Sequence, residues 1–245
     1  MTNLEFISAA WSAPKNVRAV TTTRAGGISH GVYSSLNLGD QVGDEPERVQ
    51  QNRALVGEAL HLPAAPVWLK QVHGVEVLDA AHTRAGAIAD GAYANRRGVV
   101  CAVLTADCLP VFICDRDGTT IALLHAGWRG LAAGVIEAGV KAMGIASGEL
   151  IAHVGPGIGP DSYEVGDDVR ATFTGRDSTA TDAFRPRGDG RWLADMPRLA
   201  QQRLRALGIC DISVDARCTF RERDMFFSYR RDGACGRMAS LIWIE

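Results

Sequence analysis

Short apolar runs recur along the whole chain, and their length constrains its fold more than any other feature. They are rich in aliphatic and β-branched residues and lie at 17–22, 67–72, 75–78, 99–104, 109–114, 119–125, 151–154, 209–215 and 238–244. Runs of this length between turn residues predict buried strands. Asp117-Gly118 predicts a tight turn between two of them.

Helical spacing of apolar residues appears in only three places. Asp44 and Glu47 form a capping pair before the first predicted helix, and the second covers 130–143. The third begins at Asp195 and ends at Gly208, which suits a left-handed cap. Strands joined both by hairpins and by helical crossovers predict a mixed α/β fold of the α+β class, neither a purely parallel sheet nor a helical bundle.

One stretch, 173–191, is poor in apolar residues and predicts a long surface loop or an irregular insertion. There is no internal repeat or low-complexity tract, so residues 1–245 are expected to form a single domain.

Charge and the absence of targeting signals limit the partners. The chain has 26 basic and 28 acidic side chains, so no broad basic surface is expected to bind nucleic acid. No signal peptide is recognisable, and every apolar run is too short for a membrane helix. We therefore expect a cytoplasmic protein. The six cysteines, which include no Cys-x-x-Cys pair, are then expected to stay reduced.

Three potential metal ligands lie at or beside the predicted strand ends. His73 follows one run, Cys108 lies just after another, and His125 ends a third. Known catalytic zinc sites use three imidazoles, or two thiolates with one imidazole, and leave a fourth position open. A set of two imidazoles and one thiolate lies between these two. It also resembles the trigonal donor set of a copper site.

The same residues allow two readings without metal. Cys108 is a candidate nucleophile with His125 as its base. Alternatively, both histidines bond the backbone in turns and Cys108 belongs to the core. The segment from His125 to Gly130 opens a helix, and its backbone N–H groups together with Arg129 would favour an anion nearby.

Several long motifs together resemble one family. They are TTTRAGGIS at 21–29, YSSLNLG at 33–39, WLKQVHG at 68–74, TADCLP at 105–110, HAGWRG at 125–130, FSYRRDG at 227–233 and GRMAS at 236–240. The chain resembles the YfiH family over nearly its whole length, and members are labelled polyphenol oxidase, laccase domain protein or purine nucleoside phosphorylase. It departs where the family often has cysteines before Tyr163; here Asp161 and Ser162 stand there.

The resemblance implies a layered sandwich of mixed sheets with flanking helices, in a monomeric cytoplasmic enzyme. It implies a metal site of His73, Cys108 and His125, usually with zinc. The implied activities are phosphorolysis of adenosine, inosine and methylthioadenosine and deamination of adenosine. A multicopper laccase is excluded, because it needs many imidazoles and the chain has six histidines with no His-x-His pair. Copper replacing zinc would still support weak phenol oxidation as a side reaction.

Roles within this activity follow as hypotheses. The substrates would be a purine nucleoside and phosphate. Arg129 or Arg53 would hold phosphate, and Asn37 would touch sugar or base. Asp107 and Glu164 are candidate acid or base groups, although Asp107 also suits a turn. For deamination, zinc-activated water would attack the purine C6.

Two other functional classes compete with this reading. One is a metal-free cysteine hydrolase using Cys108 and His125. The other is a non-catalytic module that binds a nucleotide or a cell-wall fragment.

Overall fold

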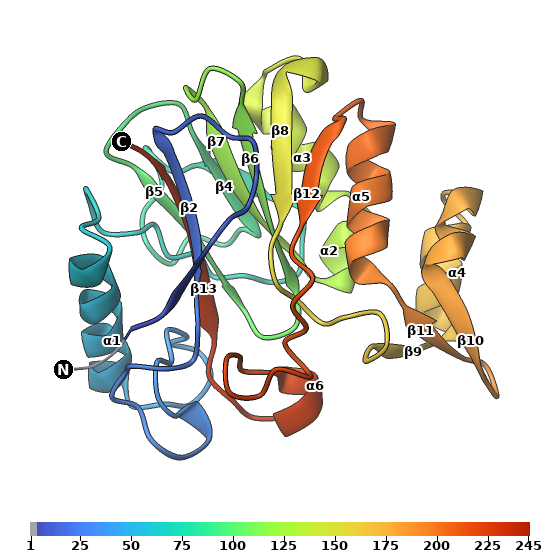
Figure 1. The fold of residues 1–245 in the computed structure, drawn as a ribbon, viewed down its shortest axis with the longest axis horizontal. Coiled ribbons are helices and arrows are strands. Elements are labelled where there is room, and N and C mark those ends of the chain that lie inside the picture. The colour runs from blue at the N-terminus through green and yellow to red at the C-terminus, as the bar shows by residue number, and fades with distance from the viewer. Residues whose placement is uncertain (1–3) are drawn as a thin grey trace.

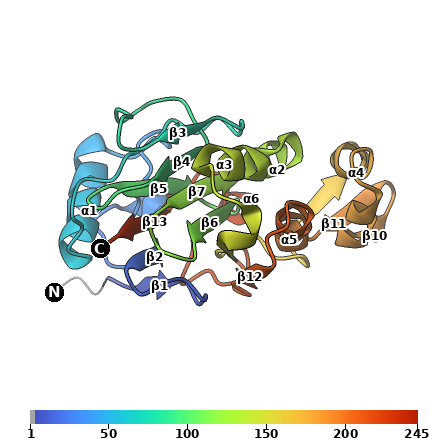
Figure 2. The same ribbon diagram turned by 90° about the horizontal axis from the view of Figure 1, so that it is seen from above.

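A computed structural model describes residues 4–245. Its elements stack in layers: a helix, a four-stranded sheet, a six-stranded sheet and a second set of helices, with a small lobe beside them (Figure 1). The view from above shows the two large sheets as neighbouring layers with α3 and α5 on the far side (Figure 2). The predicted mixed α/β sandwich is confirmed.

The four-stranded sheet is antiparallel and has the order β1-β2-β13-β5. Its strands are β1 (Phe6–Ser8), β2 (Val17–Thr22), β13 (Met238–Ile244) and β5 (Val100–Thr105). Successive side chains of a strand point to opposite faces. Accordingly, Ile242 and Ile244 of β13 face the six-stranded sheet, whereas Leu241 and Trp243 pack on the side that faces α1.

The six-stranded sheet is buried on both faces, which explains its nearly continuous apolar runs. In sheet order its strands are β12 (Asp211–Val214), β8 (Leu150–Val154), β6 (Leu109–Asp115), β7 (Ile121–Ala126), β4 (Gly91–Ala94) and β3 (Val77–Asp79). The two outermost pairs are parallel and the inner pairs antiparallel. Phe112 and Leu123 face the four-stranded sheet, while Val111 and Leu124 face the helices.

Helices cover the outer faces of both sheets. The covering helices are α1 (Pro46–Ala59), α2 (Trp128–Ala133), α3 (Val135–Met143) and α5 (Met196–Ala206), whereas the short α6 (Tyr229–Asp232) buries no residue and lies beyond the end of β13 (Figure 1). Val56 of α1 joins the core of the four-stranded sheet, whereas Ile136 of α3 and Leu199 of α5 join that of the six-stranded sheet. No helix within residues 4–245 is long and apolar enough to cross a bilayer.

The prediction of a surface loop at 173–191 is wrong. This segment holds the end of α4 (Asp167–Thr174), a 3-10 turn, strand β10 (Phe184–Gly188) and the start of β11 (Arg191–Ala194). With β9 (Glu164–Gly166) the strands form a small antiparallel sheet in the lobe beyond α5 (Figure 1). The sequence signal was weak because β10 exposes every residue after Phe184.

Two helix predictions also need correction. The expected helix over 130–143 is two helices, because Gly134 has a left-handed φ of 108°, which ends α2 before α3 begins. The capping pair at the start of α1 does not form, because Glu45 is the capping position. Asp44 instead accepts hydrogen bonds from Ser29 and Asn37. The third helix matches its prediction, with Asp195 bonding the backbone N–H of Arg198.

Most predicted strands are confirmed within two residues, but 67–72 is not a regular strand. It makes only isolated bridges, Val67 with Cys101 and Lys70 with Ile88. Its side chains bond elsewhere, as Gln71 does with both backbone groups of Leu104. The segment therefore runs beside β5, from Cys101 to Leu104, and carries His73 to the site.

Candidate metal centre

The structure brings His73, Cys108 and His125 together. One potential ligand atom from each lies within 4.8 Å of the others. The Cys108 Sγ atom is 3.8 Å from His73 Nε2, and the two imidazole rings meet edge to face with centroids 4.8 Å apart. His125 is buried, Cys108 is partly exposed and His73 is exposed, so the cluster opens to solvent on the His73 side.

Each donor is delivered by a different element. His125 lies near the end of β7, and Cys108 in the tight turn between β5 and β6. His73 lies in the irregular segment before β3 and has a φ of 60°, a left-handed conformation unusual for a non-glycine residue. Asp107, next to Cys108, has a φ of 99°. Backbone strain of this kind persists only where the surroundings enforce it and concentrates at functional sites.

Asp90 holds two of the donors in place. This fully buried carboxylate accepts hydrogen bonds from His125 Nδ1 at 2.8 Å and from the backbone N–H of His73 at 2.9 Å. Its second oxygen accepts from the backbone N–H groups of Val72 and Gly74. A carboxylate on Nδ1 fixes the tautomer of His125 and leaves Nε2 available as a ligand.

Hydrogen bonding decides the charge of Asp90. Burial opposes its ionisation, but the hydrogen bonds from His125 and the backbone outweigh that effect and hold the pKa of Asp90 below its usual value. The carboxylate is therefore anionic and strengthens its hold on the imidazole.

Two glycines of the HAGWRG segment leave room for the cluster. A Cβ atom on Gly127 would lie 2.7 Å from His73 Cδ2 and 3.0 Å from Cys108 Sγ. One on Gly130 would lie 2.8 Å from the carbonyl oxygen of Gly74. The start of α2 thus packs directly against the His73 turn, which only residues without a side chain permit.

Cys108 and His125 stabilise each other's charged forms. Burial opposes ionisation of the Cys108 thiol, but the His125 charge and hydrogen bonding to both imidazoles lower its pKa to about 6. Burial likewise disfavours the charged His125, yet the Cys108 thiolate and Asp90 raise its pKa to about 9. The thiolate is the form of cysteine that ligates metals and attacks electrophiles.

The donor set fits a transition metal. Around a tetrahedral zinc ion, nitrogen and sulfur ligands lie about 3.5 Å apart, given bond lengths of about 2.0–2.3 Å. The His73–Cys108 separation of 3.8 Å is close to this value. All three donor atoms lie within 4.8 Å of one another, and the exposed His73 ring is the donor least held by its surroundings.

The cluster faces a cavity of about 820 Å³. This volume falls within the range of about 300–1,000 Å³ typical of small-molecule sites. Its walls include the loop at 39–42, the α2 start, Tyr163 and three residues of the C-terminal segment, Tyr229, Arg230 and Arg237.

Asp107 and Arg129, both predicted from the sequence, line this cavity. Asp107 is buried, and its two carboxylate oxygens accept hydrogen bonds from Thr219 Oγ1 and the backbone N–H of Arg230. Acid or base chemistry at Asp107 would therefore disturb one of these bonds. Arg129 is exposed and stacks on Trp128.

The structure does not bring Asn37, Arg53 or Glu164 to the cavity wall. Asn37 is fully buried, and its amide bonds Gly39, Asp44 and the Arg237 backbone. Arg53 bonds the carbonyl oxygen of Leu38 and stacks on Trp68. The carboxylate of Glu164 lies 3.4 Å from Arg187. Asn37 and Arg53 thus support the loop that forms the wall.

Sequence reasoning missed Asp90, Tyr229, Arg230 and Arg237. Asp90 had one signal, since it is a carboxylate directly after the apolar Ile88 and Ala89. The other three lie in motifs that carried the family resemblance but no assigned role. Their approach to the cavity depends on how the C-terminal segment folds back.

Comparison with known proteins places the chain in an established group. Residues 18–245 match the family described as multi-copper polyphenol oxidoreductase laccase. The chain is 48% identical to "purine nucleoside phosphorylase YfiH" of Escherichia coli strain K12 over 241 residues, covering 98% of this chain and 99% of that protein. A Pseudomonas aeruginosa protein, also named a purine nucleoside phosphorylase, is 46% identical over 241 residues, 98% of each chain.

Solved structures agree with the fold. The crystal structure of a Neisseria meningitidis protein has a TM-score of 0.95 and 48% identity, and the match covers 98% of this chain and 99% of that one. A Bacillus licheniformis protein titled hypothetical protein YfiH has a TM-score of 0.86 at 30% identity, over 94% and 93% of the two chains.

Proposed function

We propose that this chain, which belongs to the multi-copper polyphenol oxidoreductase laccase family, is a metal-dependent purine nucleoside phosphorylase. The convergence of His73, Cys108 and His125 at the cavity is the observation that carries the proposal. The names of the relatives supply the reaction class. The proposed substrates are adenosine, inosine and methylthioadenosine, each with inorganic phosphate.

We propose that these three side chains hold zinc. When bound, such an ion supplies Lewis-acid chemistry. The protein's own contribution is orientation: Asp90 fixes the rings through His125 Nδ1 and the His73 backbone. The His125 charge favours the Cys108 thiolate before any ion arrives.

Phosphorolysis replaces the bond between ribose C1′ and purine N9 with a bond to phosphate. In the proposal Arg129 binds the phosphate, because it lines the cavity and has no ion pair within residues 4–245. Tyr229, 61% exposed at the same cavity, offers a ring on which a purine can stack. Asp107 orders the turn that presents Cys108, through its bonds to Thr219 and Arg230.

Release of hypoxanthine from inosine tests this assignment. The zinc-loaded protein should release the base only when phosphate is present, and ribose 1-phosphate should accumulate in equal amount. Release that does not depend on phosphate would show hydrolysis and overturn the phosphorylase assignment.

Deamination of adenosine and weak phenol oxidation with copper are proposed side activities. Two imidazoles and a thiolate also suit copper, which outbinds zinc at such donors. Within residues 4–245 this is the one group of three such donors, so it provides a place for one ion rather than several. Inosine formation from adenosine, and phenol oxidation by copper-loaded protein, would be measured separately.

The lowered pKa of Cys108, about 6, favours a second candidate, a metal-free cysteine hydrolase. In that enzyme Cys108 attacks and His125 serves as acid and base. Iodoacetamide would abolish its turnover while a chelator would leave it intact. The phosphorylase proposal expects the chelator to remove activity and zinc to restore it.

A further inference from the structure

Three arginine–aromatic pairs surround the cavity. In each pair a guanidinium lies over the ring of a residue that also lines the cavity: Arg129 on Trp128 at 4.5 Å, Arg230 on Tyr163 at 4.7 Å and Arg237 on Tyr229 at 5.8 Å. Stacking holds each guanidinium in a preferred orientation, so less side-chain entropy is lost when it binds a ligand.

Of these arginines, Arg237 keeps a free binding edge. The Nη1 atom of Arg230 donates to the carbonyl oxygen of Glu164, and its side chain also hydrogen-bonds Tyr163. Arg237 uses only Nη1, which bonds the carbonyl oxygens of Cys235 and Gly236 and the Cys235 sulfur. The Nε and Nη2 atoms of Arg237 therefore make no hydrogen bond within residues 4–245, and this is the edge that binds a phosphate with two parallel hydrogen bonds.

The acidic groups at the cavity do not neutralise these charges. Its lining includes two carboxylates, Asp40 and Asp107. Asp40 lies 3.5 Å from Arg53, outside the lining. The oxygens of Asp107 accept from Thr219 and the Arg230 backbone. Three guanidinium groups thus face the cavity without an acidic side-chain partner.

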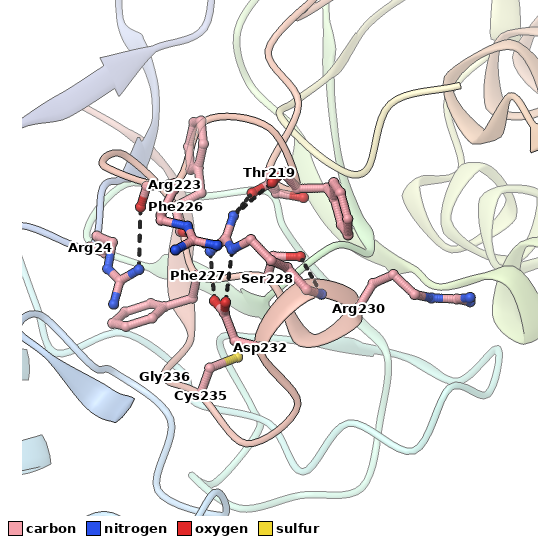
Figure 3. Close-up of polar contacts among 12 residues, drawn as sticks. Arg24, Thr219, Arg223, Phe226, Phe227, Ser228, Arg230, Asp232, Cys235 and Gly236 are labelled. Carbon is pink, nitrogen blue, oxygen red and sulfur yellow. Dashed lines mark hydrogen bonds and ion pairs between the residues drawn. The ribbon is translucent and has the colours of Figure 1, made fainter. Parts of the chain in front are cut away.

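The C-terminal segment that carries two of these arginines is firmly anchored. Arg231 Nη1 donates to the carbonyl oxygens of Thr219 and Phe220, and Nη2 pairs with Asp232 at 2.7 Å. Figure 3 shows the Arg230 side chain extended away from Asp232 and Cys235. The backbone N–H of Arg237 donates to Asn37, which fixes Arg237 beside the 39–42 loop.

If the ligands are a neutral nucleoside and one phosphate, part of the positive charge of the three guanidinium groups at the cavity stays without an anionic partner. We propose that the preferred substrates are purine nucleoside 5′-monophosphates, an inference that rests on the proposed function. Arg129, two residues after Gly127, which touches the donor cluster, holds inorganic phosphate. Arg237, which lies against the 39–42 loop, holds the 5′-phosphate, and Arg230 lies on the same anchored segment.

The reaction balances without an oxidant or reductant. A phosphate oxygen forms a bond to ribose C1′ as the C1′–N9 bond breaks. The electron pair of that bond leaves with the purine, which takes up a proton. Adenosine 5′-monophosphate and phosphate therefore give adenine and ribose 1,5-bisphosphate.

The test compares kcat/KM for AMP and adenosine at fixed phosphate in the zinc-loaded protein. One charge-assisted contact is worth about 1.5–3 kcal/mol, so AMP should be favoured by about tenfold to a hundredfold. Arg237→Gln should reduce this ratio at least tenfold. Arg205→Gln, which removes an exposed arginine outside the cavity wall, should keep it.

The outcomes separate the two proposals. Cleavage of adenosine at least as efficient as that of AMP would overturn the nucleotide preference and leave the phosphorylase standing. A ratio unchanged by Arg237→Gln would overturn the assignment of the 5′-phosphate to Arg237. Phosphate-dependent cleavage of neither compound, nor of inosine, would overturn both proposals.

Discussion

Gly127 lies between two of the three donor side chains, and changing it to alanine perturbs the donor geometry without removing a donor. The added Cβ would lie 2.7 Å from His73 Cδ2, 3.0 Å from Cys108 Sγ and 3.4 Å from His73 Nε2. The backbone itself tolerates alanine, since φ is −67° at this position. The whole effect therefore falls on the donor cluster.

The first contact is too short to persist, so an atom must move. His73 is exposed and swings outward more easily than the Cys108 turn shifts. We therefore expect a loss of about 1 kcal/mol in folding stability, at the low end for overpacking. Separation of the donors should weaken zinc binding by about tenfold to a hundredfold, as disturbed metal-ligand orientation usually does.

Competition between the protein and a chromophoric chelator measures the zinc affinity, and urea denaturation measures the stability. Gly148→Ala is the matched control, because a Cβ there meets no atom within 4 Å and the backbone is unstrained. Wild-type zinc affinity in Gly127→Ala would refute the donor geometry. A matching drop in the control would show a general effect of replacing glycine.

Three further substitutions test the site and its surroundings. Cys108→Ala should abolish both zinc binding and phosphate-dependent turnover, as elemental analysis and an inosine assay would show; full activity would contradict the ligand assignment. Asp90→Asn should weaken zinc binding by about tenfold to a hundredfold, because His125 loses its anionic partner; an unchanged affinity would rule out this role. His153 tests pH dependence: burial lowers its pKa to about 4, so the unfolded chain takes up a proton that the folded chain excludes. Stability should therefore fall by about 3 kcal/mol as the pH drops from about 6.5 to about 4. His153→Gln should remove this loss in urea denaturation at pH 7 and 4.5, and an equal loss in the variant would refute the assignment.

The sequence predicted the sheets well because their strands are buried on both faces. The run that became β13 was predicted at its observed bounds, since alternate residues face two different cores. The lobe sheet escaped prediction because β10 exposes Arg185, Arg187 and Gly188 and has no apolar face to detect. The break at Gly134 depends on a left-handed φ that helical spacing does not reveal.

The three donors were candidates from the sequence because they lie at or beside predicted strand ends, and the family resemblance selected them as metal ligands. Their neighbours could not, because those contacts join distant segments. Asp90 reaches His125 only after β4 pairs with β7. Arg230 and Arg237 reach the cavity through the anchoring of Arg231 and the bond between Arg237 and Asn37. Asn37 itself was predicted to touch substrate, but its buried amide supports the wall instead.

Elemental analysis of the purified protein, combined with its phosphate-dependent release of hypoxanthine, tests the central claim most directly. We predict one zinc ion per chain, with metal and turnover lost together on chelation and recovered together when zinc is added back. Full phosphate-dependent turnover by protein free of transition metal would contradict a metal centre at His73, Cys108 and His125.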